Sequence, residues 1–199
     1  MIWQQQWELF APNFKDGKAH IDLTPYGCSE VLQLYPGPGF GDLSHPTTRI
    51  VLKLMQPYVK DRAVVDIGCG SGILSLAAAA MGASHVDGYD IDPEAVEHAK
   101  KNAKGKIHFA TKPPNKISPI ILMNMISSEQ AQAWSVIENR IPPDAILITS
   151  GILEENADEY LDWRIKQGWS VKQKLTEDGW IGFGLHHIAH ATHSSHAVH

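Results

Sequence analysis

VVDIGCGSGILSL, residues 64–76, is an apolar run interrupted by three glycines, with one acid just ahead of them. The part before the glycines has the composition of a buried strand, and the part after them that of a helix. A glycine-rich turn between a strand and a helix is typical of nucleotide-binding α/β folds, which hold different cofactors there. The spacing of the glycines and of nearby acids therefore discriminates between the ligands that the turn could bind.

The glycines are Gly68, Gly70 and Gly72, which follow the pattern G-x-G-x-G. The dinucleotide fingerprint G-x-G-x-x-G would need a glycine at position 73 or 75, where the chain has Ile73 and Ser75. The G-K-[ST] ending of the P-loop is also absent. The turn is therefore poorly suited to hold a pyrophosphate.

Two acids flank this turn. Asp66 precedes Gly68 by two residues, where its charge would repel phosphate and favour a cationic group. Asp90 ends the next predicted strand, 22 residues after Gly68 (90 − 68), close to the spacing of about 20 residues at which a carboxylate binds a ribose diol. The expected ligand carries ribose, lacks a pyrophosphate and has a positive group near Asp66. S-adenosylmethionine meets all three conditions.

Strands and helices alternate along most of the chain, which predicts a Rossmann-like α/β fold, a mostly parallel sheet with helices on both faces. The closing segment 170–187 is predicted to be an antiparallel hairpin around Asp178 and Gly179. The other predicted strands are 63–68, 85–91, 106–110, 117–125 and 145–152, and the predicted helices are 46–59, 72–82, 92–105, 127–141 and 155–168.

Three helix starts have recognisable capping residues. Asp92 is the expected N-cap of helix 92–105, with Pro93 at its first position. The helix from Pro46 is expected to be capped by Thr47 or Ser44. Helix 127–141 is expected to be capped by Ser127 or Ser128.

Residues 1–45 are predicted to form a lead helix, short strands and a lid loop. Trp3, Trp7 and Phe10 fall on one face of a helix at 1–13, which we interpret as packing on the same domain, with a partner or membrane surface as the alternative. Two short strands within 19–35 are expected around a turn at Pro25 and Gly27. The stretch 36–48 is rich in proline and glycine, and it predicts a loop.

Composition sets the class of protein. The 199 residues suffice for a single domain, which we assign to 1–185. The formal net charge is −5 without a Lys/Arg-rich block, which argues against a broad nucleic-acid surface. Two cysteines, no secretory signal and no membrane-length apolar run indicate a cytoplasmic protein without a membrane partner. Residues 186–199 hold six of the eleven histidines and are expected to form a disordered tail.

The quoted stretch together with GYDIDPEAV resembles the cofactor-binding half of class I S-adenosylmethionine-dependent methyltransferases. The resemblance implies that Asp66 holds the methionine moiety and that Asp90 holds the ribose hydroxyls. Further candidates for cofactor binding are the glycine turn, Gly68, Cys69, Gly70 and Gly72, together with Ile91 and Thr111. Phe40 is a candidate that either packs over the cofactor or only closes the loop. No metal ligands are expected.

The segments LYPGPGFGDLSHPTTR and SGILEENADEY extend the likeness to PrmA-type methyltransferases, which modify amino groups of ribosomal protein L-eleven. The likeness covers residues 3–185, and the separate N-terminal recognition domain of that family is expected to be missing. In the lid loop, Asp42 and Leu43 replace a threonine and a glycine of the family pattern. The segment FATKPPNK lacks the family's acid near the adenine, so apolar and backbone contacts are expected there.

The resemblance implies that Asn124, in the loop after the fourth strand, orients the target amine through its side-chain oxygen, and a loop-capping asparagine is the alternative. His45 is a second candidate base or donor, or only a helix-start residue, whereas Trp180 is expected in the core. The predicted function is methylation of amino groups of a protein such as a ribosomal protein. The alternatives are a methyltransferase for RNA or a small molecule, and a non-catalytic module that binds S-adenosylmethionine.

Overall fold

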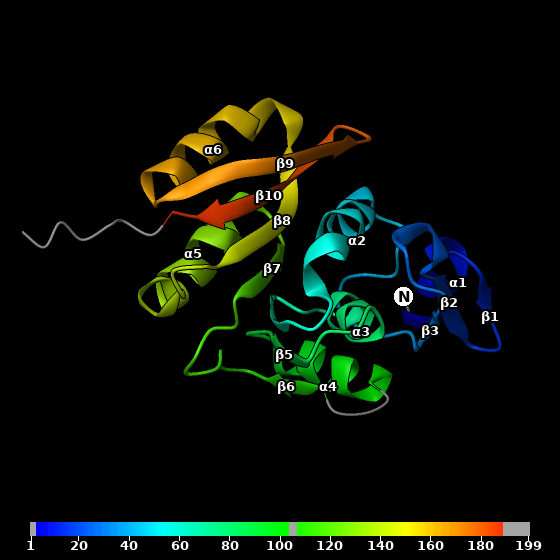
Figure 1. Cartoon of the computed structure of the whole chain (residues 1–199). Helices are drawn as coiled ribbons and strands as arrows, with labels where there is room; N and C mark the ends of the chain where they lie inside the picture. Colours follow the sequence, from blue (N-terminus) through cyan, green and yellow to red (C-terminus); the bar gives the residue numbers. More distant parts are fainter. Residues whose placement is uncertain (1–2, 104–106, 189–199) are drawn as a thin grey trace, which may run out of the picture.

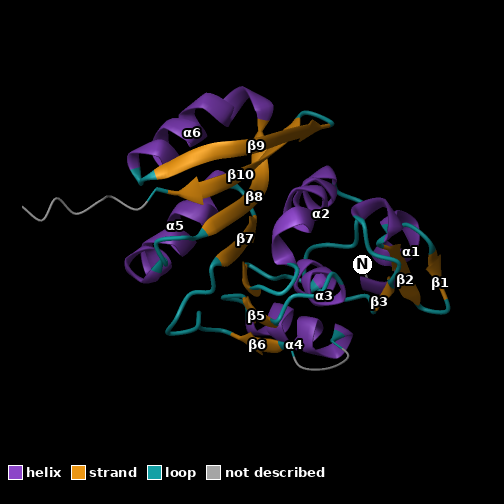
Figure 2. Ribbon diagram, in the orientation of Figure 1, coloured by secondary structure: helices purple, strands orange, loops and turns teal. Residues whose placement is uncertain are grey.

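The computed structural model describes residues 3–103 and 107–188. Its centre is a seven-stranded sheet with the order β6-β5-β4-β7-β8-β10-β9 (Figures 1 and 2). The first five strands in this order are parallel, and β10 pairs antiparallel with both of its neighbours, β8 and β9, so the predicted fold class is confirmed. The strands are β4 (Ala63–Ile67), β5 (His85–Tyr89), β6 (His108–Ala110), β7 (Ile120–Asn124), β8 (Ile146–Leu153), β9 (Trp169–Glu177) and β10 (Trp180–His187).

Helices cover both faces of this sheet, and α2 and α3 lie on the opposite side from α5 and α6 (Figure 2). This arrangement buries both faces of β4, β7 and β8, whose sequences are accordingly almost all apolar. The helices are α2 (Pro46–Val59), α3 (Ile73–Ala80), α4 (Pro93–Asn102), α5 (Ser127–Ile137) and α6 (Ala157–Lys166), with short 3₁₀ turns at Glu138–Arg140 and Glu154–Asn156.

A small three-stranded sheet precedes the main one, built from β1 (Phe14–Lys15), β2 (Lys18–Asp22) and β3 (Val31–Leu34). The two strands expected within 19–35 are confirmed, and the 3₁₀ turn Thr24–Tyr26 joins them. The lead helix is shorter than expected, α1 (Trp3–Phe10), and only Trp7 of its three aromatic residues is buried. Trp7 belongs to the main core, so the helix packs on its own domain as predicted, whereas Trp3 and Phe10 are 47% and 63% exposed.

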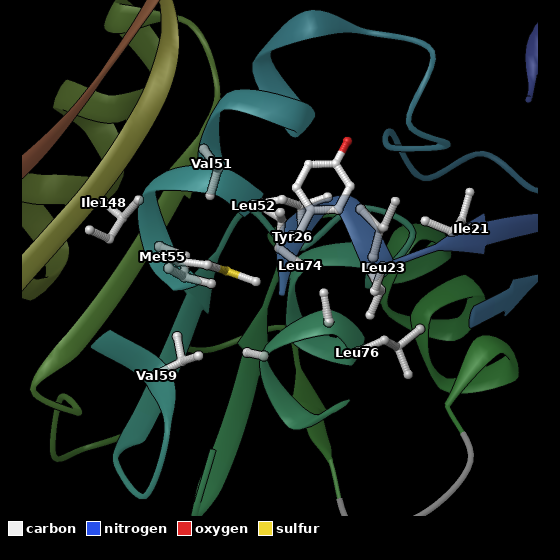
Figure 3. Close-up of a cluster of buried hydrophobic side chains, with 14 of the residues drawn as sticks. Ile21, Leu23, Tyr26, Val51, Leu52, Met55, Val59, Leu74, Leu76 and Ile148 are labelled. Carbon is white, nitrogen blue, oxygen red and sulfur yellow. The ribbon is translucent and has the colours of Figure 1, made fainter. Parts of the chain in front are cut away.

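The small sheet joins the domain through a continuous apolar core. Leu23 and Tyr26, in the connection between β2 and β3, meet Leu52 and Met55 of α2 and Leu74 of α3 (Figure 3). Each of these side chains is at least 94% buried, and full burial of such a residue contributes about 1.5–3 kcal/mol. The N-terminal segment is therefore part of the same folded unit as the sheet.

Helix starts agree with the sequence in one case out of three. Asp92 caps α4, because its carboxylate accepts the Glu94 N–H at 2.9 Å. In α2, Pro46 occupies the first helical position, which makes His45 the N-cap in place of Thr47 or Ser44. In α5 the N-cap is Ile126, without a side-chain bond, so both expected serine caps are wrong.

The C-terminal hairpin turns at Asp178 and Gly179, whose φ values of 51° and 78° match the predicted turn. Strand β10 continues through His186 and His187, which were expected to open the tail. Residues 189–199 and Gly105 lie outside the described residues. Among the helices that the structure describes, none is long and apolar enough to cross a membrane.

Candidate functional site

A cavity of about 750 Å³ opens at the carboxyl ends of β4, β5, β7 and β8. Its walls come from the glycine turn, the lid loop (residues 36–45), the first turns of α5 and the C-terminal hairpin. In an α/β sheet this edge, where neighbouring crossovers diverge, is the usual place for a ligand. The volume is in the range of small-molecule and cofactor sites.

The glycine turn lies on the floor of the cavity. Gly68 and Gly70 have backbone φ values of 76° and 53°, which residues other than glycine rarely adopt. A Cβ atom on Gly70 would also collide with the carbonyl oxygen of Phe40 in the lid loop. The N–H of Gly68 donates to the Tyr89 carbonyl at 2.7 Å, which ties the turn to the end of β5.

Asp90 holds the turn and faces the cavity. One carboxylate oxygen accepts the Gly70 N–H at 2.9 Å, and the other accepts the Asp92 N–H at 3.0 Å. Because a carboxylate has about four acceptor positions, two backbone bonds leave capacity for hydroxyl donors of a ligand. Asp90 is thus held in place by the backbone, on the wall of the cavity.

Asp66 lies beneath the turn and is fully buried. Its Oδ2 atom accepts the N–H and the hydroxyl of Ser75 at 3.1 and 2.6 Å, whereas its Oδ1 atom has no partner within the described residues. Burial raises the pKa of this carboxyl to about 7, against the lowering effect of the Ser75 bonds and with a smaller raising effect of the Asp90 charge. Asp66 can therefore gain or lose its charge near neutral pH.

Asn124 ends β7 on the wall of the cavity. Its side-chain NH₂ donates to the hydroxyl of the fully buried Thr48 at 3.3 Å. Its side-chain oxygen is buried and accepts no hydrogen bond from the described part of the chain. A buried amide oxygen left without a donor is a costly feature, which a ligand N–H would relieve.

Gln130, which the sequence did not single out, fixes the backbone around Asn124. Its amide NH₂ donates to the Met125 carbonyl at 2.9 Å and to the Ser150 carbonyl at 3.0 Å. Its side-chain oxygen accepts from Tyr160, Thr149 and Arg164. One fully buried side chain therefore joins the ends of β7 and β8, and no local sequence signal could have indicated this long-range contact.

Aromatic rings line the mouth of the cavity. His45 packs edge-on against Phe40, with ring centroids 5.5 Å apart, and against Trp180, at 5.0 Å. Trp180 is half-buried and packs against the main core, as expected, but the hairpin also brings it to the cavity wall, which was not expected. Burial, and then the charge of Arg49, lower the pKa of His45, with an opposing effect of Asp42.

The lid loop keeps a glycine-like backbone despite its altered sequence. Leu43 has a φ of 74°, a conformation that glycine adopts more easily. Arg49 of α2 donates to the Leu43 and Ser44 carbonyls at 3.1 and 2.8 Å, and its Nε lies 2.5 Å from Glu177 of the hairpin. One guanidinium thus ties the lid loop to the hairpin, on both sides of the cavity mouth.

The predicted site residues are divided by the structure into two groups. Six of them line the cavity: Phe40, Gly68, Gly70, Asp90, Ile91 and Asn124. Four do not: Asp66 and Cys69 are buried beneath the turn, Gly72 begins α3, and Thr111 is exposed beyond β6. Burial raises the pKa of the Cys69 thiol, which disfavours its reactive thiolate.

The chain matches the family described as "Ribosomal protein L11 methyltransferase (PrmA)" over residues 20–187. The relative of that name from Bacillus licheniformis is 34% identical over 175 residues, which cover 80% of this chain and 55% of the relative. The relative from Methylococcus capsulatus is 32% identical over 195 residues, which cover 90% of this chain and 66% of the relative. The chain thus spans between about half and two thirds of the length of these relatives.

Solved structures agree with this match. A ribosomal protein L11 methylase from Lactobacillus delbrueckii subsp. bulgaricus superposes with a TM-score of 0.74 at 25% identity, covering 92% of each chain. An RNA methyltransferase from Salinibacter ruber, solved with S-adenosyl-L-homocysteine, shares the fold alone, with a TM-score of 0.55 at 16% identity over 70% of this chain and 91% of that one. Since the family match runs from β2 to the end of β10, the chain belongs to the ribosomal protein L11 methyltransferase (PrmA) family.

Proposed function

We propose that the chain is an S-adenosylmethionine-dependent methyltransferase that acts on amino nitrogen of a protein, with ribosomal protein L11 as the first candidate. Membership of the family and the names of its relatives support the reaction and the substrate class. A ribosomal protein would be met in the cytoplasm, which is where we propose that the enzyme acts. The residues of the cavity support each part of this proposal.

The cavity fits S-adenosylmethionine. Asp90 would accept the ribose hydroxyls with the acceptor capacity that its two backbone bonds leave free. The unpartnered Oδ1 atom of Asp66 would attract the positive end of the ligand from beneath the turn. Ile91, 82% exposed on the cavity wall, would cover the adenine with apolar surface, in place of the missing acid.

The chemistry itself needs little from the protein beyond placement. When bound, S-adenosylmethionine would supply a methyl group on a sulfonium. A neutral amine would attack the methyl carbon in line, and the carbon–sulfur bond would break to release S-adenosylhomocysteine. A lysine has a reference pKa of about 10.4, so its amine must first lose a proton, for which solvent at the cavity mouth is available. Asn124 would accept a hydrogen bond from the amine and so aim its lone pair. Phe40, His45 and Trp180 would exclude water from the aliphatic stem of the acceptor.

The unpartnered oxygen of Asn124 is the observation that carries this proposal, because it is a buried acceptor that finds no donor among the described residues and belongs to a side chain of the cavity wall. The test is turnover of the purified chain with methyl-labelled S-adenosylmethionine and isolated L11. We expect Asn124→Ala to lower kcat at least about 100-fold, as loss of a positioning contact does, with S-adenosylhomocysteine affinity unchanged within about twofold. Equal kcat in the two proteins would refute the role of Asn124.

The same methyl-labelled S-adenosylmethionine distinguishes between the competing functions. Parallel reactions with ribosomal RNA and with a small-molecule extract would show label there if the acceptor is not a protein. Absence of label in every fraction, with S-adenosylhomocysteine bound, would favour the non-catalytic module. The altered residues Asp42 and Leu43 motivate this last alternative, although Arg49 holds their loop in place.

A further inference from the structure

His98 of α4 joins three parts of the molecule that are distant in sequence. Its Nδ1 atom accepts the backbone N–H of Gly39 in the lid loop at 3.1 Å. Its Nε2 atom lies 2.6 Å from the carbonyl oxygen of Tyr35, which precedes the lid loop. Its ring meets the ring of Trp7 in α1 edge-on, with centroids 5.7 Å apart. The residue is 4% exposed, so both nitrogens have their partners inside the protein.

These contacts fix the tautomer of His98. A carbonyl oxygen can only accept, so Nε2 carries the proton and Nδ1 presents its lone pair to Gly39. A second proton on Nδ1 would place two donors against each other. Burial lowers the pKa of His98, against the raising effect of the Tyr35 carbonyl and together with the charge of Lys101. Lys18 of β2 adds a further positive charge nearby, 4.6 Å from the Tyr35 ring centroid.

The lid loop has the shape that this imidazole requires. A Cβ atom on Gly37 would overlap the His98 ring, and one on Gly39 would overlap the backbone of Gly70 in the glycine turn. The loop is therefore held between α4 on one side and the glycine turn on the other. Phe40, which lines the cavity, follows directly.

The lid loop in turn is bonded to the glycine turn. The N–H of Ser71 donates to the Phe40 carbonyl at 2.8 Å. One helical turn beyond His98, the side chain of Asn102 accepts the Tyr35 N–H at 2.8 Å and donates to the Ser71 carbonyl at 2.9 Å. The two α4 side chains thus contact the lid loop and the glycine turn from the same face of the helix.

We propose that His98 is a positioning residue that holds the lid loop closed on the glycine turn and thereby sets the affinity of the cavity for its nucleoside ligand. Closure of the loop follows from the protein contacts alone. The effect on affinity rests on the proposed function. Because Trp7 packs on the same ring, α1 shares in fixing the loop.

Three substitutions separate the two bonds of His98. His98→Asn keeps an acceptor near the position of Nδ1, His98→Gln keeps a donor near the position of Nε2, and His98→Leu removes both. His85→Asn is the matched control, because the half-exposed His85 begins β5, at the end of the strand away from the cavity, and pairs with Asp87 two residues along the same strand. Denaturant unfolding of all variants identifies any general loss of stability.

Exchange of the Ser71 amide hydrogen reports closure directly, because its acceptor is in the lid loop. We expect its protection to fall about tenfold in His98→Leu, to recover at least partly in His98→Asn, and to stay unchanged in His85→Asn. S-adenosylhomocysteine affinity, measured by calorimetry, should fall in the same order. If His98→Leu does not fold, the comparison of His98→Gln with His98→Asn takes its place, with the larger loss expected for His98→Gln.

Wild-type protection of Ser71 in a folded His98→Leu protein, or equal protection in the Gln and Asn variants, would overturn the assignment. A wild-type chain that does not bind S-adenosylhomocysteine would refute the proposed cofactor instead. In that case the amide exchange of Ser71 would still decide whether His98 closes the loop.

Discussion

Replacement of Asp66 by asparagine should change how the stability of the protein depends on pH. Asp66 is fully buried, and burial raises its pKa from 3.8 to about 7. At about 1.4 kcal/mol per pKa unit, this means that the ionised form costs the native state about 4 kcal/mol relative to the protonated form. Asp66→Asn keeps the size of the side chain and an oxygen that can accept from Ser75, but it cannot ionise.

The sign of the effect follows from proton binding. Between pH 3.8 and about 7, native Asp66 holds a proton that the unfolded chain has lost. The stability contributed by the protonated carboxyl is therefore complete below pH 3.8 and falls as the pH rises, by about 1.4 kcal/mol per pH unit, until it levels off above about 7. The asparagine variant lacks this decline.

Urea unfolding of both proteins at pH 5, 6, 7 and 8 measures the difference between their free energies of unfolding. The contributions of other titrating groups, which are the same in both proteins, cancel in this difference. We expect the stability of the variant relative to the wild type to increase by about 3 kcal/mol between pH 5 and pH 8. This is a large part of the total stability of about 5–15 kcal/mol of a typical domain. A difference that stays constant over this pH range would refute the raised pKa and the buried, sparsely bonded state of Asp66 from which it follows.

Two further substitutions test the walls of the cavity. Asp90→Asn keeps a side-chain oxygen that can accept the Gly70 N–H, but the ribose hydroxyls lose a charged partner. S-adenosylhomocysteine binding, measured by calorimetry, should therefore weaken by about 1–3 kcal/mol. Unchanged affinity would contradict a ribose contact. Gln130→Met should lower kcat about tenfold or more with little change in ligand affinity, because Asn124 loses its backbone support. Thr149→Val is the control, because it removes a donor to the Gln130 oxygen and an acceptor for the Tyr160 hydroxyl but leaves the Gln130 bonds to the Met125 and Ser150 carbonyls in place, and equal losses in both variants would count against this role.

The sequence predicted those parts of the site that depend on local spacing. Gly68, Gly70 and Asp90 were found because a strand, a tight turn and a second strand bring residues about 20 positions apart to one sheet edge. Gln130, His98 and Trp180 were missed, because their roles come from contacts with segments that are 20 or more positions away. In the sequence alone, a glutamine or histidine on a polar helix does not differ from a solvated one.

The predicted N-cap residues of α5 were wrong for a related reason. Ser127 and Ser128 are good N-cap residues by type, but the cap is chosen by where β7 ends. Gln130 fixes the Met125 carbonyl, so the chain turns into α5 already at Ile126. Tertiary contacts here override the local preference of serine for the N-cap position. They also decide at the lead helix, where Trp7 is the one aromatic side chain that is buried.

Both acids that were predicted to bind the cofactor are first of all partners of the protein's own backbone. Asp90 accepts the Gly70 N–H, and Asp66 accepts the Ser75 N–H. Truncation of Asp90 would therefore loosen the glycine turn, and truncation of Asp66 the first turn of α3 that follows it. A lower ligand affinity would not by itself demonstrate contact with the ligand. A cycle that combines Asp90→Asn with a 2′-deoxyribose analogue of S-adenosylhomocysteine resolves this ambiguity. If Asp90 contacts the diol, the loss on removing the hydroxyl should shrink in the variant, whereas equal losses would assign Asp90 to the turn alone.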